Sequence, residues 1–147
     1  MCKDRSSITG LALLATVVSG CASAQGVPLQ SQIRIERLVQ SSSAWDATPY
    51  RRYPDGQPLI SVLRITVAPH TALEWHSHPM PNAAYVLSGE VTLERRDGIR
   101  EHFVAGQALT ETVDRIHRGI TGETSVVLVV FYAGTPGLAL SQPASSL

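Results

Sequence analysis

The chain has 147 residues, the length of one domain, and its 12 basic residues balance its 12 acidic residues. A formal charge of zero gives no electrostatic basis for binding a polyanion, so nucleic acid is not an expected partner. The composition shows no sign of a disordered, collagen-like or disulfide-knotted chain. These features predict a single globular domain.

The first 20 residues have the features of a bacterial signal peptide. Lys3 and Arg5 precede an apolar run over residues 8–18, which ends in small residues and is too short to span a bilayer. Cys21 follows the sequence Val-Ser-Gly, which resembles the lipobox of bacterial lipoproteins, where the cysteine is lipidated. We therefore predict a periplasmic protein anchored by a lipid on Cys21.

Ordinary cleavage after Ala24 is the alternative, because residues 22–24 also have the small-x-small pattern. The mature protein would then be soluble in the periplasm or secreted. Residues 21–32 are small and polar and contain a glycine and a proline, so they are predicted to form a flexible tether. No cysteine follows Cys21, so any metal must be bound by nitrogen and oxygen atoms.

Residues 33–134 contain short apolar segments separated by turn residues. A first strand is predicted over residues 33–39, where Ile33 and Ile35 alternate with polar residues. Further strands are predicted over residues 59–67, 85–87, 91–93, 99–104, 109–113 and 126–132. The last of these is apolar on both faces, which is typical of a strand buried between two layers.

The connections between these strands carry their own signals. Asp97-Gly98 predicts a hairpin with a type I′ turn, in which both central residues have positive φ. Trp45, Tyr50 and Tyr53 lie in a loop that closes one end of the core or covers the mouth of a cavity. Residues 135–147 are predicted to be a C-terminal tail.

No segment shows a sustained helical period, and turn signals recur at short intervals. The predicted fold is therefore all-β, with about eight or nine strands forming a closed β-barrel or jelly roll. Closure would also leave no exposed strand edge.

His76 and His78 are the clearest candidate for a chemical site. In an extended segment, side chains two residues apart point to the same face, so the two imidazoles form a ready chelate. Pro79 and Pro81 cannot donate to a sheet ladder, so the strand ends or bends there. The chain then returns with Asn82 towards the same interior.

This segment resembles the first motif of the cupin superfamily, in which a glycine, two histidines, a glutamate and a second glycine have a fixed spacing. His76, His78 and Gly89 stand at the histidine and final glycine positions. His70 replaces the first glycine, at a turn whose φ is expected to be positive, a conformation that histidine tolerates. Asn82 replaces the glutamate that binds metal in the family.

The second cupin motif is matched at two positions only. Gly106 and His117 stand at its glycine and its histidine. Thr112, Asp114 and Thr121 stand where the motif has proline, glycine and asparagine.

The resemblance, which covers residues 60–133, implies a single cupin barrel that holds a divalent metal through His76, His78 and His117. Asn82 is the candidate fourth ligand, although its neutral carbonyl oxygen binds a dication more weakly than a carboxylate does. Iron, zinc, nickel and manganese all suit such a site, and the sequence does not choose between them.

Glu111 and Glu74 are the candidate acid–base residues. Glu111 lies on the strand leading to His117, and it faces either the cavity or the solvent according to the register. Glu74 has the same parity as His76 and His78 and could point inward or sit at the barrel rim.

Arg115 could bind a substrate carboxylate in a bidentate manner or form a surface ion pair with Asp114 or Glu111. His102 lies in a separate strand, fits no ligand position and is predicted to be a surface residue.

Two classes of function remain open. The first is a metal-dependent enzyme, dioxygenase-like or isomerase-like, that acts on a small oxygen-rich molecule in the periplasm. The second is a non-catalytic module that binds a metal or a small ligand. Membrane contact is expected only through the lipid on Cys21, and the family resemblance implies a homodimer.

Overall fold

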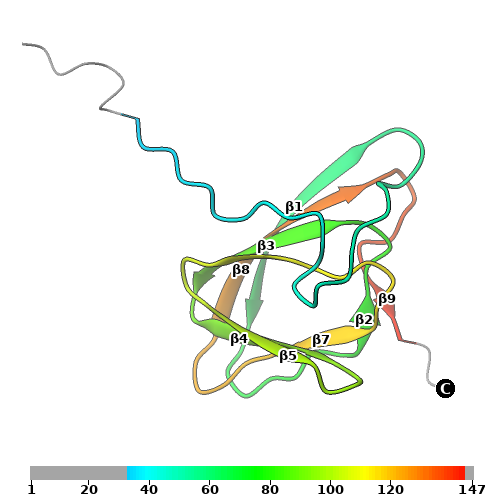
Figure 1. Cartoon of the computed structure of the whole chain (residues 1–147). Helices are drawn as coiled ribbons and strands as arrows, with labels where there is room; N and C mark the ends of the chain where they lie inside the picture. Colours follow the sequence, from blue (N-terminus) through cyan, green and yellow to red (C-terminus); the bar gives the residue numbers. More distant parts are fainter. Residues whose placement is uncertain (1–32, 145–147) are drawn as a thin grey trace, which may run out of the picture. The chain divides into compact units, whose positions relative to one another are not determined.

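A computed structural model of the chain describes residues 33–144 (Figure 1). The predicted signal peptide (residues 1–20) and the tether (residues 21–32), including Cys21, lie outside the described residues. Contacts divide the chain into residues 1–35 and residues 36–147, and the strands belong to the second unit. In the described part, no helix is long and apolar enough to cross a membrane.

The second unit consists of two antiparallel sheets. Its strands are β1 (Leu59–Val67), β2 (His76–Ser77), β3 (Asn82–Ser88), β4 (Glu90–Arg95), β5 (Arg100–Val104), β6 (Ala108–Thr110), β7 (His117–Ile120), β8 (Val126–Gly134) and β9 (Gln142–Pro143). One sheet has the order β1-β8-β3-β6, and the other has the order β5-β4-β7-β2-β9. The predicted all-β fold is confirmed.

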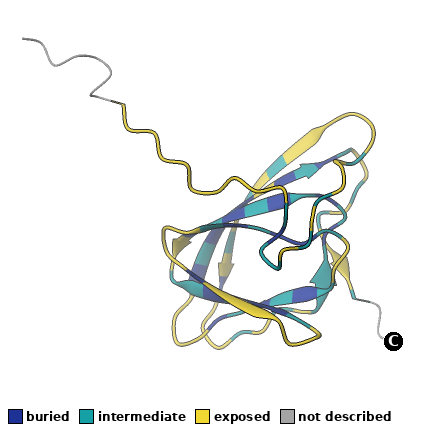
Figure 2. Cartoon of the chain, in the orientation of Figure 1, coloured by how far each residue is buried: buried dark blue, intermediate teal, exposed yellow. Residues whose placement is uncertain are grey.

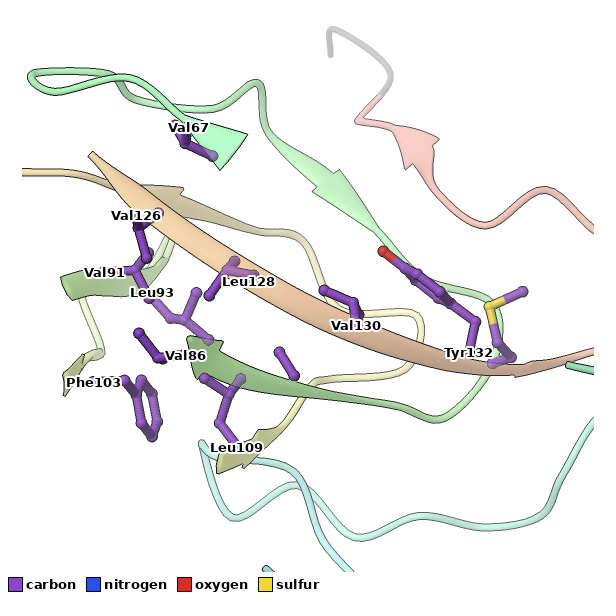
Figure 3. Packing of buried hydrophobic residues seen from close by; sticks show 12 residues of the cluster. Val67, Val86, Val91, Leu93, Phe103, Leu109, Val126, Leu128, Val130 and Tyr132 are labelled. Atoms are coloured by element: carbon purple, nitrogen blue, oxygen red, sulfur yellow. The ribbon is translucent and has the colours of Figure 1, made fainter. Parts of the chain in front are cut away.

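The core lies between the two sheets. Along β8 the residues facing the other sheet are buried and the alternate residues are more accessible, as the period of two requires (Figure 2). Figure 3 shows Val126, Leu128 and Val130 in one row on β8, with Tyr132 continuing the row at one end of the cluster. The prediction that this strand is buried on both faces is wrong, because no layer formed by residues 33–144 covers its outer face, where Phe131 is 40% exposed.

The predicted strand over residues 33–39 does not form. Ile33 and Ile35 are 66% and 90% exposed, and this segment pairs with no described strand. Alternation of apolar residues predicts a strand only when a sheet edge is available to pair with it. Further along, the chain docks on the barrel, where Trp45 N–H donates to the Thr110 carbonyl at 2.8 Å.

The hairpin between β4 and β5 forms at the predicted place but with a different turn. Gly98 has a φ of 88°, whereas Asp97 is not among the residues with positive φ. Gly98 N–H donates to the Arg95 carbonyl, and Arg95 N–H donates to the Ile99 carbonyl. The connection is therefore a three-residue loop with one left-handed residue, and the predicted type I′ turn is wrong.

The C-terminal residues take part in the barrel. In β9, Pro143 pairs with His76 and Gln142 pairs with Ser77. Leu138 and Leu140 pack against the core cluster. This segment therefore lies beside the strand that carries His76.

Candidate metal site

The sheet register brings the three predicted histidines together. His76 of β2 and His117 of β7 are direct cross-strand partners, and their ring centroids are 4.7 Å apart. His78 follows β2 and forms an isolated bridge with Val113, and its ring centroid lies 5.2 Å from that of His117. Residues from two distant parts of the chain thus converge on one point between the sheets.

Backbone carbonyls fix the orientation of all three rings. The Nδ1 atoms of His76, His78 and His117 lie 2.7, 2.6 and 2.9 Å from the carbonyl oxygens of Glu74, Leu140 and Arg115. With Nδ1 protonated, each ring donates to its carbonyl and presents Nε2 to the interior of the cluster. Anchoring one ring nitrogen in this way is how proteins orient histidine ligands to metals.

Glu111 completes the cluster with a carboxylate. Its Oε2 atom lies 3.0 Å from Nε2 of His78 and 2.9 Å from Nε2 of His117. One potential ligand atom from each of His76, His78, Glu111 and His117 lies within 4.8 Å of all the others. Of the two orientations considered for Glu111, the inward one is therefore observed.

The pairing of β3 and β6 explains why Glu111 points inward. Ala83 pairs with Thr110, and continuing this register by one residue sets Asn82 opposite Glu111. Glu111 N–H donates to the Asn82 carbonyl at 3.0 Å. Residues opposite each other in an antiparallel pair point to the same face, so both side chains are directed to the barrel interior.

Asn82 is buried, with 3% of its surface exposed. Among the described residues, neither its amide nitrogen nor its amide oxygen has a hydrogen-bond partner. A buried amide without partners is costly, so this position calls for a ligand, water or ion that satisfies it.

Burial alone would raise the pKa of the Glu111 carboxyl and lower the pKa of His78. The hydrogen bond and the charge attraction between Glu111 and His78 outweigh this effect of burial. His117 adds a second hydrogen bond and charge attraction to Glu111. The pKa of Glu111 therefore lies well below its ordinary value, and the pKa of His78 lies above its own. Burial lowers the pKa of His76, and the neighbouring His117 and His78 act in the same direction.

A small cavity of about 70 Å³ adjoins the cluster. Apart from the cluster residues, it is lined mainly by aliphatic side chains of both sheets, among them Ile65, Leu93 and Leu128. Tyr132 is a polar exception, and its ring centroid lies 5.7 Å from that of His78. Burial and the charge of Glu111 raise the pKa of Tyr132 to about 12.

The other predicted site residues lie elsewhere. Glu74 is exposed and does not line this cavity, and its backbone carbonyl is the group that contacts His76. Arg115 is also exposed, and it forms no ion pair with a described residue. His102 is exposed on β5, as predicted, and its Nε2 atom lies 3.5 Å from Oε2 of Glu90.

The positions that depart from the cupin motifs have clear structural roles. His70 and Asp114, which stand where the motifs have glycine, have φ values of 51° and 55°. The hydroxyl of Thr112 lies 3.0 Å from Nδ1 of His117 and helps to hold that ring. The hydroxyl of Thr121 donates to the Ala68 carbonyl. At these positions, His70 and Asp114 therefore adopt a positive φ, and Thr112 supports the His117 ring.

Sequence reasoning did not identify Glu111 as a member of the ligand cluster, or Tyr132 and Leu140 as neighbours of it. Strand parity relates Glu111 to its near neighbours only, whereas its direction depends on pairing with a strand almost 30 residues earlier. Leu140 carries no side-chain signal, because its backbone carbonyl makes the contact.

Known proteins share this fold. Residues 63–132 match the family model described as a cupin domain. The polyketide cyclase RemF from Streptomyces resistomycificus is similar, with 20% identity and a TM-score of 0.52, over 60% of this chain and 62% of the cyclase. The DMSP lyase DddQ from Ruegeria pomeroyi DSS-3 has 15% identity and a TM-score of 0.50, over 54% of this chain and 41% of the lyase.

A protein with a double-stranded β-helix domain from Klebsiella pneumoniae subsp. pneumoniae MGH 78578 has 24% identity and a TM-score of 0.50, over 66% of this chain and 87% of its own. This chain spans less than two thirds of the cyclase and of the lyase. At these identities the likeness concerns the fold, and no curated protein sequence matches the chain. The cupin-domain match covers residues 63–132, and the structural neighbours share the fold of this domain.

Proposed function

We propose that His76, His78, His117 and Glu111 hold a divalent first-row metal ion and that this site acts on a small oxygen-bearing molecule. The observation that carries the proposal is the anchoring of three Nδ1 atoms on backbone carbonyls, which directs three rings to one point beside a buried carboxylate. An arrangement needed only for packing would not require three oriented imidazoles.

The donor set fits such an ion. Three imidazole nitrogens and one carboxylate oxygen suit iron, zinc, nickel or manganese and contain no thiolate. Glu111 supplies the negative charge that Asn82 lacks, so a bound dication would be partly neutralised. Ligand atoms bind a metal in their deprotonated form, so binding would replace the contacts of Glu111 with Nε2 of His78 and of His117.

A bound dication would act as a Lewis acid on an oxygen atom of the ligand. The chain's own residues would do the rest. The aliphatic lining of the cavity offers an apolar surface to the ligand, and the neutral Tyr132 phenol can donate a hydrogen bond to an oxygen atom in the cavity. The cavity volume of about 70 Å³ favours a substrate of few non-hydrogen atoms.

The same small volume favours the second candidate, a non-catalytic module that binds a metal or small ligand. A cavity of about 70 Å³ has room for a few water molecules, which would suffice to complete the coordination of an ion without a substrate. The two functions differ in turnover. A panel of diketones, catechols and hydroxy acids, assayed for dioxygen consumption and for isomerised products, would separate them.

The first test is elemental analysis of untagged protein, wild type against His76→Ala. We expect one metal ion per wild-type chain and a loss of affinity of more than about 100-fold in the variant, because removing a residue that only supports a ligand already costs 10–100-fold. His102→Ala is the matched control, since it removes an exposed imidazole outside the cluster. Wild-type protein that stays metal-free after reloading would refute the proposal.

We further propose that the protein acts in the bacterial periplasm, anchored by a lipid on Cys21 or released after cleavage at Ala24. The support is the order of charged residues, apolar run and small residues in the first 24 positions. A homodimer is proposed from the family resemblance, and the exposed Ile60, Val62 and Phe131 on β1 and β8 offer an apolar surface for it.

A further inference from the structure

A second and larger cavity lies outside the metal site, with a volume of about 450 Å³. One wall is formed by residues 48–54, and the other by Pro79 and residues 113–115. We call this cavity the arginine groove. Its volume lies within the range of roughly 300–1,000 Å³ that is usual for small-molecule sites.

The arginine groove adjoins the histidine cluster through the chain. Pro79 directly follows His78, and Val113, which bridges to His78, lies between Glu111 and His117. The opposite wall is attached to the segment between β6 and β7, because the Tyr50 hydroxyl donates to the Glu111 carbonyl at 2.6 Å. A ligand in the groove would therefore touch the segments that position the cluster.

The charge of the groove is unbalanced. Arg51, Arg52 and Arg115 line it against a single carboxylate, that of Asp114. Arg52 is paired with Asp55 at 2.9 Å. Within the described part of the chain, Arg51 and Arg115 form no ion pair, so two guanidinium groups are available for an anion.

The rest of the lining indicates what kind of anion would fit. Tyr50 and Tyr53 provide aromatic surface, and three prolines add apolar surface. Guanidinium groups bind planar carboxylates through paired hydrogen bonds, whereas aromatic and proline surfaces favour an apolar body. We propose that the arginine groove binds a small organic carboxylate with an aromatic or otherwise apolar body.

The proposal does not depend on a metal, because no groove arginine belongs to the histidine cluster. Benzoate is a suitable probe, and its binding to the full chain can be followed by NMR titration. We expect shifts centred on the amides of Arg51, Tyr53 and Arg115. Arg51→Ala and Arg115→Ala should each weaken binding roughly tenfold, which corresponds to about 1.4 kcal/mol.

Matched controls separate the contributions. Arg64→Ala removes an exposed arginine on β1, which lies outside the groove, and should leave benzoate binding unchanged. Benzamide, which keeps the ring and lacks the charge, should bind at least roughly tenfold more weakly, as expected when a charged contact worth about 1.4 kcal/mol is lost. Inorganic phosphate that competes as well as benzoate would overturn the organic part of the proposal. Benzoate affinity that is equal in wild type and both groove variants would overturn the site itself.

The metal proposal is tested separately with the His76→Ala variant. If the arginine groove is correct, this variant still binds benzoate. Loss of metal with retained benzoate binding would support both proposals, whereas a metal-binding wild type without benzoate binding would overturn the groove alone.

Discussion

Asn82 at the start of β3 lies opposite Glu111, the residue that follows β6, and this pair sets the charge of the candidate metal site. The cupin motif has a carboxylate at position 82, whereas here the carboxylate of the cluster comes from Glu111, just after the neighbouring strand β6. Both side chains point to the same interior, so a carboxylate at position 111 instead of position 82 still lies close to His78 and His117.

Substitutions at positions 82 and 111 test directly which of the two supplies the carboxylate to the metal ion. Glu111→Gln should weaken metal binding by about 10–100-fold, because a neutral oxygen replaces a carboxylate within the cluster. Adding Asn82→Glu to that variant should restore part of the affinity, measured by competition with a chelator. Affinity unchanged by Glu111→Gln would show that Glu111 does not contact the ion.

At the scale of elements, the turns hold the strands in register. Gly89 between β3 and β4 has a φ of 75°, and a Cβ atom there would lie 2.0 Å from the Ser125 carbonyl oxygen. Gly98 in the next hairpin has a φ of 88°, and a Cβ atom there would have no neighbouring atom within 4 Å. The two glycines therefore share a backbone requirement and differ in steric room.

This difference predicts the outcome of two alanine substitutions. Gly98→Ala should cost about 1–2 kcal/mol of unfolding free energy, the penalty of a left-handed alanine. Gly89→Ala should cost more than about 3 kcal/mol, because the backbone around Ser125 must also move. Urea denaturation of both variants measures the difference, and equal losses would contradict the close approach.

Asp46 ties the segment before β1 to the end of β4. Its carboxylate accepts hydrogen bonds from Thr48 N–H at 2.9 Å and from Arg95 Nη1 at 2.8 Å, and its side chain is fully buried. Burial alone would raise the pKa of Asp46, but the hydrogen bonds from Thr48 and Arg95 lower it overall. The stabilisation is therefore present above the ordinary pKa and is lost as the pH falls through the lowered value.

Asp46→Asn should reduce the unfolding free energy at neutral pH by about 1.5–3 kcal/mol, the contribution of a hydrogen bond to a charged group. The difference from wild type should shrink on acidification below about pH 4, as the wild-type carboxylate becomes protonated. Asp97→Asn is the control, because the more exposed Asp97 pairs with the same arginine and should cost less than about 1 kcal/mol. A loss of unfolding free energy that does not change with pH would mean that the substitution acts through packing and not through the charge of Asp46.

For the whole molecule, the C-terminal segment contributes to the candidate metal site. The Leu140 carbonyl holds the His78 ring, and β9 pairs with the strand that carries His76. The edge of the second sheet therefore also positions two of the proposed ligands.

The predicted lipid anchor gives a cellular test. Cys21→Ala should abolish lipidation and move the protein from the membrane fraction to the soluble fraction, because a diacylglyceryl group buries many methylene groups in the bilayer. Mass spectrometry of the mature N-terminus and fractionation would measure both effects. A wild-type mature protein that begins after Ala24 without a lipid would favour the alternative cleavage.

The sequence by itself determined the all-β class, most strand positions and the three histidines. These follow from local information: side-chain alternation, turn residues and motif spacing within a short stretch of chain. The inward orientation of Glu111, the support of His78 by Leu140 and the arginine groove were decided only by the tertiary structure. Each depends on pairing between segments from about 30 to more than 60 residues apart, where a shift of one residue reverses the direction of a side chain.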